Sequence, residues 1–231
     1  MIELYYWPTP NGQKIALFLE EAGLEYEIRP VNINKGDQFK PDYLAISPNN
    51  KMPAIVDRAP ADGGAPISVF ESGAILLYLA DKTRQLIPAD IRGRVMAMQW
   101  LFWQVGGLGP MVGQSHHFNR FAPEKIPYAI ERYVREMRRL FGVLDKHLEG
   151  RDFICGTDYT IADIASYPWI ASREAQEVAV AEFSNLERWS ASIRARPATQ
   201  RVYARGEKIN PPGQKMTDEA RRFLFGQGAG R

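Results

Sequence analysis

The chain has 231 residues, of which 45% are hydrophobic and 24% are charged, an ordinary balance for one or two globular domains. A formal net charge of +2 argues against nucleic acid as the main partner. The sequence contains no apolar run long enough to predict a membrane span. The single cysteine, Cys155, excludes an intrachain disulfide, which suits a reducing cytoplasm.

The N-terminal part predicts a small α/β domain. Its apolar residues alternate in short runs, and one run at helical spacing ends at Gly23. Pro8, Pro10 and the Asn11-Gly12 pair predict a turn before that helix. Strands are predicted at residues 2–7, 26–32, 53–57 and 67–70, and helices at 15–22, 41–46 and 72–81.

The rest of the chain predicts helices, and no strand pattern is convincing there. A capping-box pattern, Thr160-Ile161-Ala162-Asp163, opens one helix and suggests no chemistry. Gly106 to Pro110 would let helices cross closely or kink. Helices are predicted at 91–104, 126–148, 160–169 and 183–193. We expect four parts: a first domain at 1–82, a linker at 83–90, an all-helical domain at 91–205, and a loose or partly disordered tail at 206–231.

Pro53 stands at the start of a short β-branched strand, directly after a polar loop. A proline lacks the N–H group that a strand needs, so it fits only a first residue, an edge or a bulge. A trans proline at a strand start explains it. A cis Met52–Pro53 bond would instead turn the Met52 main chain outward, where it could pair with an extended peptide.

Glu71 and Ser72 lie where a strand runs into an apolar helix. Ser72 stands at the helix start, where free N–H groups and the helix dipole favour an anion. Glu71 offers a carboxylate to a cation. The pair is therefore either a plain helix cap or a site for a ligand with an ammonium and a carboxylate on one carbon.

These residues resemble the glutathione site of the glutathione transferase superfamily, and the resemblance extends over residues 1–205. The bacterial nu class, which includes glutathione-dependent disulfide-bond reductases, is the more similar class. The resemblance rests on Thr9-Pro10-Asn11-Gly12, Ser47 to Asp57, Trp100 to Pro110, and Ile126 to Tyr133. It implies a thioredoxin-like N-terminal domain followed by a C-terminal helical bundle.

The resemblance also implies roles for single residues. Thr9 and Asn11 would contact the glutathione sulfur as the catalytic pair, although most of the superfamily uses Tyr, Ser or Cys there. An amide is a weaker donor than a positioned hydroxyl, which disfavours strong conjugation of electrophiles. Glutathione would be bound by Asn11, Gln38 at the glycyl end, Met52 and Pro53 at the cysteinyl unit, Glu71 and Ser72 at the γ-glutamyl group, and Arg132 across a dimer interface.

The activity implied is the reduction of small disulfides by bound glutathione, a cosubstrate, with minor transferase or peroxidase activity. Two other functions stay open: a non-catalytic glutathione-binding module, and an ordinary electrophile-conjugating transferase. We expect a cytoplasmic homodimer that binds neither nucleic acid nor membrane. No metal is expected, because no further ligand accompanies the His116-His117 pair at zinc-like spacing.

Overall fold

The computed structural model describes residues 1–172, 182–213 and 216–226. Its elements form two compact units. The first unit joins Met1–Thr83 with Pro197–Arg231, and the second is Arg84–Arg196.

The first unit contains a four-stranded sheet. Its strands are β1 (Ile2–Tyr6), β2 (Tyr26–Pro30), β3 (Ala54–Asp57) and β4 (Ile67–Phe70), in the spatial order β2-β1-β3-β4. β2 runs parallel to β1, whereas β3 and β4 are antiparallel to their neighbours. The central strands carry the buried side chains, because β1 and β3 each pair on both sides. The predicted thioredoxin-like domain is confirmed.

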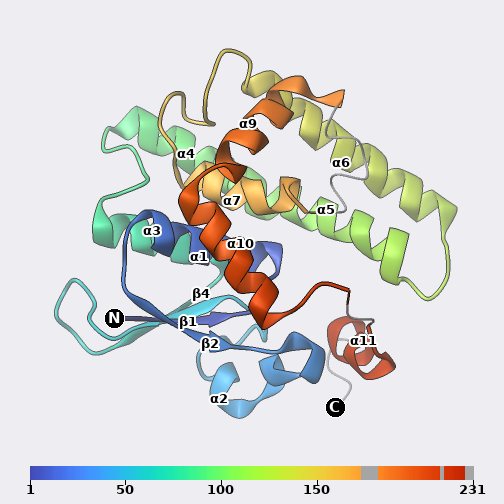
Figure 1. Ribbon diagram of the computed structural model, residues 1–231, viewed down its shortest axis with the longest axis horizontal. Helices are drawn as coiled ribbons and strands as arrows, with labels where there is room; N and C mark the ends of the chain where they lie inside the picture. The colour runs from blue at the N-terminus through green and yellow to red at the C-terminus, as the bar shows by residue number, and fades with distance from the viewer. Residues whose placement is uncertain (173–181, 214–215, 227–231) are drawn as a thin grey trace. The chain divides into compact units, whose positions relative to one another are not determined.

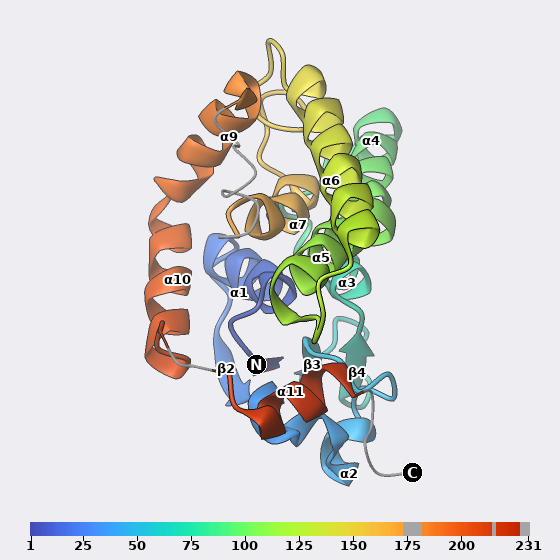
Figure 2. The same cartoon turned by 90° about the vertical axis from the view of Figure 1, so that its right-hand side faces the viewer.

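Helices cover both faces of this sheet (Figures 1 and 2). α1 (Pro10–Glu21) and α3 (Ser72–Thr83) lie on one face, and α2 (Pro41–Leu44) lies on the other. Two 3₁₀ turns, η1 (Ile33–Lys35) and η2 (Asp37–Phe39), precede α2. α1 begins inside the predicted turn, because Thr9 caps it and a proline fits the first helical position.

The predicted loose tail is wrong for the described residues. α10 (Pro197–Ile209) packs on α1, and α11 (Asp218–Phe225) packs on η1. Thr217 caps α11 by accepting a hydrogen bond from the Ala220 N–H, and two acidic residues occupy the first turn. The described residues 197–213 and 216–226 thus group with the first unit, whereas the predicted ranges put residues 197–205 in the helical domain and the rest in the tail. Residues 214–215 and 227–231 lie outside the described part, and the predicted domain ranges stay a prediction.

The second unit is helical, as predicted. Its elements are α4 (Ile91–Trp103), the π-helical turn η3 (Gln104–Leu108), α5 (Gly109–His116), the π-helical turn η4 (His117–Phe121), α6 (Pro127–His147), α7 (Ile161–Ile170) and α9 (Ser184–Arg194). The glycine-rich stretch forms η3 and leads directly into α5.

The capping box at the start of α7 is confirmed. Both its bonds are present, and the buried Asp163 carboxylate also accepts hydrogen bonds from Trp189 Nε1 and the Ile154 N–H. Among the described residues, no helix is both long and apolar enough to cross a bilayer.

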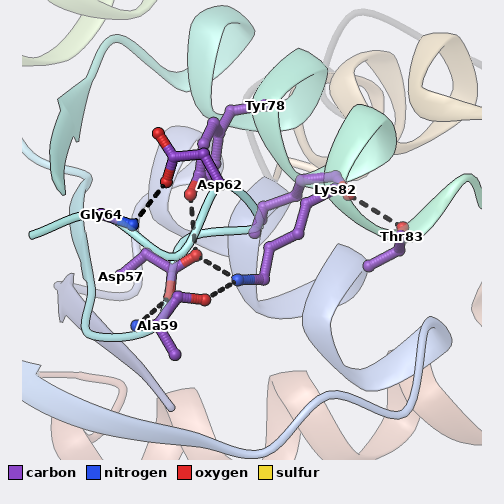
Figure 3. Close-up of polar contacts among 8 residues, drawn as sticks. Asp57, Ala59, Asp62, Gly64, Tyr78, Lys82 and Thr83 are labelled. Carbon is purple, nitrogen blue, oxygen red and sulfur yellow. Dashed lines mark hydrogen bonds and ion pairs between the residues drawn. The ribbon is translucent and has the colours of Figure 1, made fainter. Parts of the chain in front are cut away.

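A buried ion pair ties the end of β3 to the end of α3 (Figure 3). The Asp57 carboxylate is fully buried, and it accepts hydrogen bonds from Lys82 Nζ at 2.5 Å and the Tyr78 hydroxyl at 2.7 Å. The Ala59 N–H donates to its other oxygen at 2.9 Å. Burial alone would raise the pKa of Asp57, but these donors outweigh it and lower the pKa.

Asp57→Asn keeps the shape of the side chain and leaves the Lys82 ammonium without its counter-charge. We expect it to lower the free energy of unfolding by about 3 kcal/mol at neutral pH, measured by urea denaturation. Because the pKa of Asp57 is lowered in the fold, its stabilisation is present above the unfolded pKa and is lost as pH falls through the folded pKa. The difference in the free energy of unfolding between the wild type and Asp57→Asn should therefore shrink below about pH 4.

The matched control is Asp62→Asn in the same hairpin, where an exposed carboxylate accepts from the Gly64 N–H (Figure 3). A change within about 0.5 kcal/mol is expected there. Equal effects of the two substitutions would contradict the special role of the buried pair.

Candidate functional site

Directly before β3 lies a main-chain segment that forms no hydrogen bond with the described residues. The Met52–Pro53 bond is cis, and both residues are buried. The preceding loop is fixed because the Tyr43 and Ser47 hydroxyls both donate to the Lys51 carbonyl, at 2.8 and 2.9 Å. Within the described part of the chain, the Met52 main chain makes no hydrogen bond. Its pairing with an extended ligand stays a prediction.

The first turn of α1 lies against Met52. The Thr9 hydroxyl accepts from the Gly12 N–H at 3.3 Å and donates to Met52 Sδ at 3.3 Å. Asn11 follows at the second helical position and is half-buried. The structure therefore brings Thr9 and Met52 together. It also shows that the Thr9 hydroxyl already serves as a helix cap.

Gly12 is required by close packing at the same turn. A Cβ atom at this position would lie 2.1 Å from the Trp7 carbonyl oxygen and 3.0 Å from Met52 Cε. Main-chain atoms cannot move aside as a flexible side chain can, so any larger residue displaces α1 or the Met52 loop. The sequence places Gly12 in a matching motif but does not reveal this contact.

Glu71 and Ser72 form the second part of the site, at the start of α3. Glu71 has φ of +69°, a left-handed conformation that is unusual for a residue with a side chain. Its carboxylate accepts a hydrogen bond from Asn49 Nδ2 at 3.2 Å. Such strained residues are concentrated at functional sites, which favours a binding role over a plain cap.

Two neighbours of this junction were missed by sequence reasoning. Asn49 orients Glu71, and the Lys14 ammonium donates to Ser72 Oγ at 3.1 Å. Lys14 is only 1% exposed, although lysines are rarely buried. Its position four residues before Phe18 puts it on the apolar face of α1, and this anomaly is the signal that could have revealed it.

Gln38 lies in η2 and is also buried. Its Nε2 donates to the Ile33 carbonyl at 3.4 Å, whereas its Oε1 has no partner among the described residues. A buried acceptor without a donor is costly, so a ligand N–H group would be favoured there. α11 covers the neighbouring turn, since Phe223 packs against Gly36 and the Phe39 ring.

Neither tyrosine of β1 is placed to act on a thiol. Tyr6 is buried, and its hydroxyl donates to Gln13 Oε1 at 3.0 Å. Burial raises its pKa far above the ordinary value, so it stays neutral. Tyr5 packs on Tyr43, with ring centroids 6.0 Å apart. Both tyrosine side chains are therefore taken up by packing contacts within the first unit.

Arg132 belongs to the second unit, so it is described there by itself. The other arginines of α6 each have a carboxylate partner: Arg135 pairs with Glu131, Arg138 with Glu182, and Arg139 with Glu136. Arg132 is exposed and makes no ion pair or hydrogen bond with any described residue. The prediction that Arg132 is the arginine with a ligand role is untested and fits this difference.

No group of three metal-ligating side chains is present in residues 1–172, 182–213 and 216–226. The first unit instead assembles groups suited to a short peptide with charged ends. It offers a free main chain at Met52, a carboxylate at Glu71, and a hydroxyl at a helix start at Ser72. These groups lie on a thioredoxin-like sheet, the class of fold that the resemblance to glutathione transferases implies.

The chain belongs to the glutathione S-transferase family. The N-terminal domain model of the family matches residues 1–81, and the C-terminal domain model matches residues 111–197. The disulfide-bond oxidoreductase YfcG of Escherichia coli K12 is 57% identical over 199 residues, covering 86% of this chain and 93% of YfcG.

Two solved structures share the fold. A glutathione transferase family member from Pseudomonas fluorescens pf-5, with two glutathione bound, has a TM-score of 0.84 and 48% identity, covering 87% of this chain and 91% of its own. A transferase from Pseudomonas putida, with one glutathione disulfide bound per subunit, has a TM-score of 0.83 and 42% identity, covering 92% of each chain.

Gly12→Ala should damage the site through the main chain. The added methyl group meets the Trp7 carbonyl and Met52, so we expect a stability loss of about 1–3 kcal/mol. The affinity for glutathione, measured by calorimetry on the folded variant, should fall about tenfold or more.

The control is Gly142→Ala in α6, where the new methyl group would lie 3.6 Å from Phe183, an ordinary contact. It should be neutral or stabilising, because alanine favours a helix interior more than glycine does. A Gly12→Ala variant that binds glutathione as tightly as the wild type would contradict the packing argument.

Proposed function

We propose that the protein is a glutathione-dependent disulfide-bond oxidoreductase. The observation that carries the proposal is the γ-glutamyl cradle, in which Glu71 and Ser72 lie side by side at the start of α3. Two findings support it: the 57% identity to a disulfide-bond oxidoreductase, and the glutathione or glutathione disulfide in the related structures.

Each part of glutathione has a proposed partner in the first unit. Glu71 binds the γ-glutamyl ammonium, and Ser72 with the first N–H groups of α3 binds the carboxylate. The Met52 main chain, before Pro53, pairs with the cysteinyl unit. Gln38 Oε1, buried and without a described partner, accepts the glycyl N–H. The thiol then lies at the start of α1, beside Thr9 and Asn11.

The reaction requires a thiolate, and a free thiol has a pKa near 8.5. The Asn11 amide bonds the charged sulfur better than the neutral one, and the positive end of the α1 dipole favours a thiolate, so both lower this pKa. The glutathione thiolate attacks one sulfur of the substrate disulfide, and the other sulfur leaves as a thiolate. A second glutathione attacks the mixed disulfide, so glutathione disulfide and the second thiol are released.

The attacking sulfur belongs to glutathione, so the protein needs no cysteine of its own for this exchange. A cytoplasmic location is part of the proposal, because the cytosol keeps thiols reduced. Conjugation of electrophiles ranks lower, since the buried Tyr6 is already bonded to Gln13 and the predicted sulfur site holds an amide.

Ser72→Ala should weaken the binding of glutathione without changing the rate of the thiol–disulfide exchange step. Loss of a charge-assisted hydrogen bond predicts a KM for glutathione about 10-fold to 100-fold higher, measured with a small disulfide substrate. Ser68→Ala, an exposed neighbour on β4, is the control and should leave KM unchanged. Wild-type turnover no faster than in buffer would refute the oxidoreductase. Tight binding without turnover would identify a binding module, and turnover of a chloronitrobenzene alone would identify a conjugating transferase.

We further propose a homodimer in which Arg132 binds a carboxylate of the partner's glutathione. α4 carries exposed apolar side chains at Ile91, Val95 and Phe102, positions that share one helix face. Two-fold dimers bury such a stripe against its own copy. Arg132, exposed and without an ion pair among the described residues, is available to a ligand there.

A mixed dimer tests this arrangement. Arg132→Ala alone should raise KM about tenfold, whereas Arg135→Ala, which removes an arginine already paired with Glu131, should have little effect. Co-purified dimers of Ser72→Ala with Arg132→Ala, assayed at glutathione concentrations well below the wild-type KM, should regain one intact site and about half of the wild-type activity. If Arg132 acts within its own chain, both sites stay defective and no activity returns.

A further inference from the structure

Lys14 is a buried lysine on α1 whose side chain contacts the start of α3. It lies in the first half of α1, is 1% exposed, and reaches across to α3 to contact Ser72 Oγ at 3.1 Å. Taking an ammonium out of water is costly, so a buried lysine is retained where its charge or its donors are used. Its location directly behind Ser72 links it to the cradle described above.

The contact fixes what the Ser72 hydroxyl can do. An ammonium group has three donors and no acceptor, so Ser72 Oγ accepts in this bond. The hydroxyl hydrogen of Ser72 must then point elsewhere, and it reaches no acceptor among the described residues. Ser72 is therefore held as a donor, with its hydrogen available to an incoming anion.

The positive charge of Lys14 also favours an anion beside Ser72. Burial lowers its pKa to about 7, and the Glu71 carboxylate opposes that shift. A carboxylate bound beside Ser72 would favour the protonated form further. The first N–H groups of α3 also favour an anion there, so the ammonium and the helix start reinforce each other.

We propose that Lys14 is a positioning residue that holds Ser72 as a hydrogen-bond donor and places a positive charge behind it, so that the site selects ligands with a free γ-glutamyl carboxylate. The inference rests on the proposed function, because the carboxylate is that of glutathione. It adds a residue to the cradle and states which ligand group that residue discriminates.

The test is a double-mutant cycle between the protein and the ligand. Calorimetry compares glutathione, γ-aminobutyryl-cysteinylglycine, which lacks the α-carboxylate, and glutaryl-cysteinylglycine, which lacks the ammonium. For the wild type, we expect loss of the carboxylate to weaken binding about 10-fold to 100-fold. For Lys14→Met, the same loss should cost less than about 3-fold, while loss of the ammonium costs both proteins equally.

A purely structural lysine would give a different result. Lys14→Met would then weaken all three ligands by one common factor, and this outcome would overturn the inference. Gln13→Met controls for damage to α1, because Gln13 is the adjacent buried residue and bonds Tyr6 instead of Ser72. Its penalty for losing the carboxylate should match that of the wild type.

A measurement on the unaltered protein applies if Lys14→Met does not fold. The ¹³Cε resonance of Lys14 should shift when glutathione binds and should stay unchanged with the ligand that lacks the carboxylate. Equal shifts with both ligands would refute the inference. Failure of the wild type to bind glutathione at all would instead refute the proposed function, and the inference with it.

Discussion

The approach of the first turn of α1 to Met52 is the constraint on which the site depends. Thr9 caps the helix and contacts the Met52 sulfur, while Gly12 leaves space for the Trp7 carbonyl. This packing places the N-terminus of α1 beside the unused main chain before β3. The requirement is steric, because the groups proposed to contact the thiol are positioned only if the first turn of α1 stays packed against Met52.

In the proposed site, the start of α3 binds the charged end of glutathione and the start of α1 contacts its sulfur. At α3, Glu71 and Ser72 are proposed to bind the charged γ-glutamyl end of glutathione. Lys14 donates a hydrogen bond to Ser72, and Asn49 donates one to Glu71. At α1, the groups beside the sulfur are a hydroxyl already used as a cap and an amide that does not ionise. Such a site orients a thiol without supplying a strong acid or base, which suits exchange between sulfurs better than attack on demanding electrophiles.

Local patterns predicted much of the fold, and long-range contacts account for what they missed. The Thr160–Asp163 capping box and the helix start at Ser72 follow from neighbouring residues, so the sequence indicates them directly. Lys14 becomes meaningful only through Ser72, 58 positions away, and no local spacing reveals that pair. α11 could not be predicted locally, because Pro211, Pro212 and Gly213 precede it and it packs against the distant turn η1.

The packing of Phe223 against Gly36 has a consequence for how the protein is made. Residues before and after the second unit make up the first unit, whereas the second unit is continuous in sequence. During synthesis the nascent chain emerges N-terminus first, so the continuous unit has all its residues before the other does. α10 and α11 follow the second unit in the chain, so they can pack on the first unit only after the whole second unit has been synthesised.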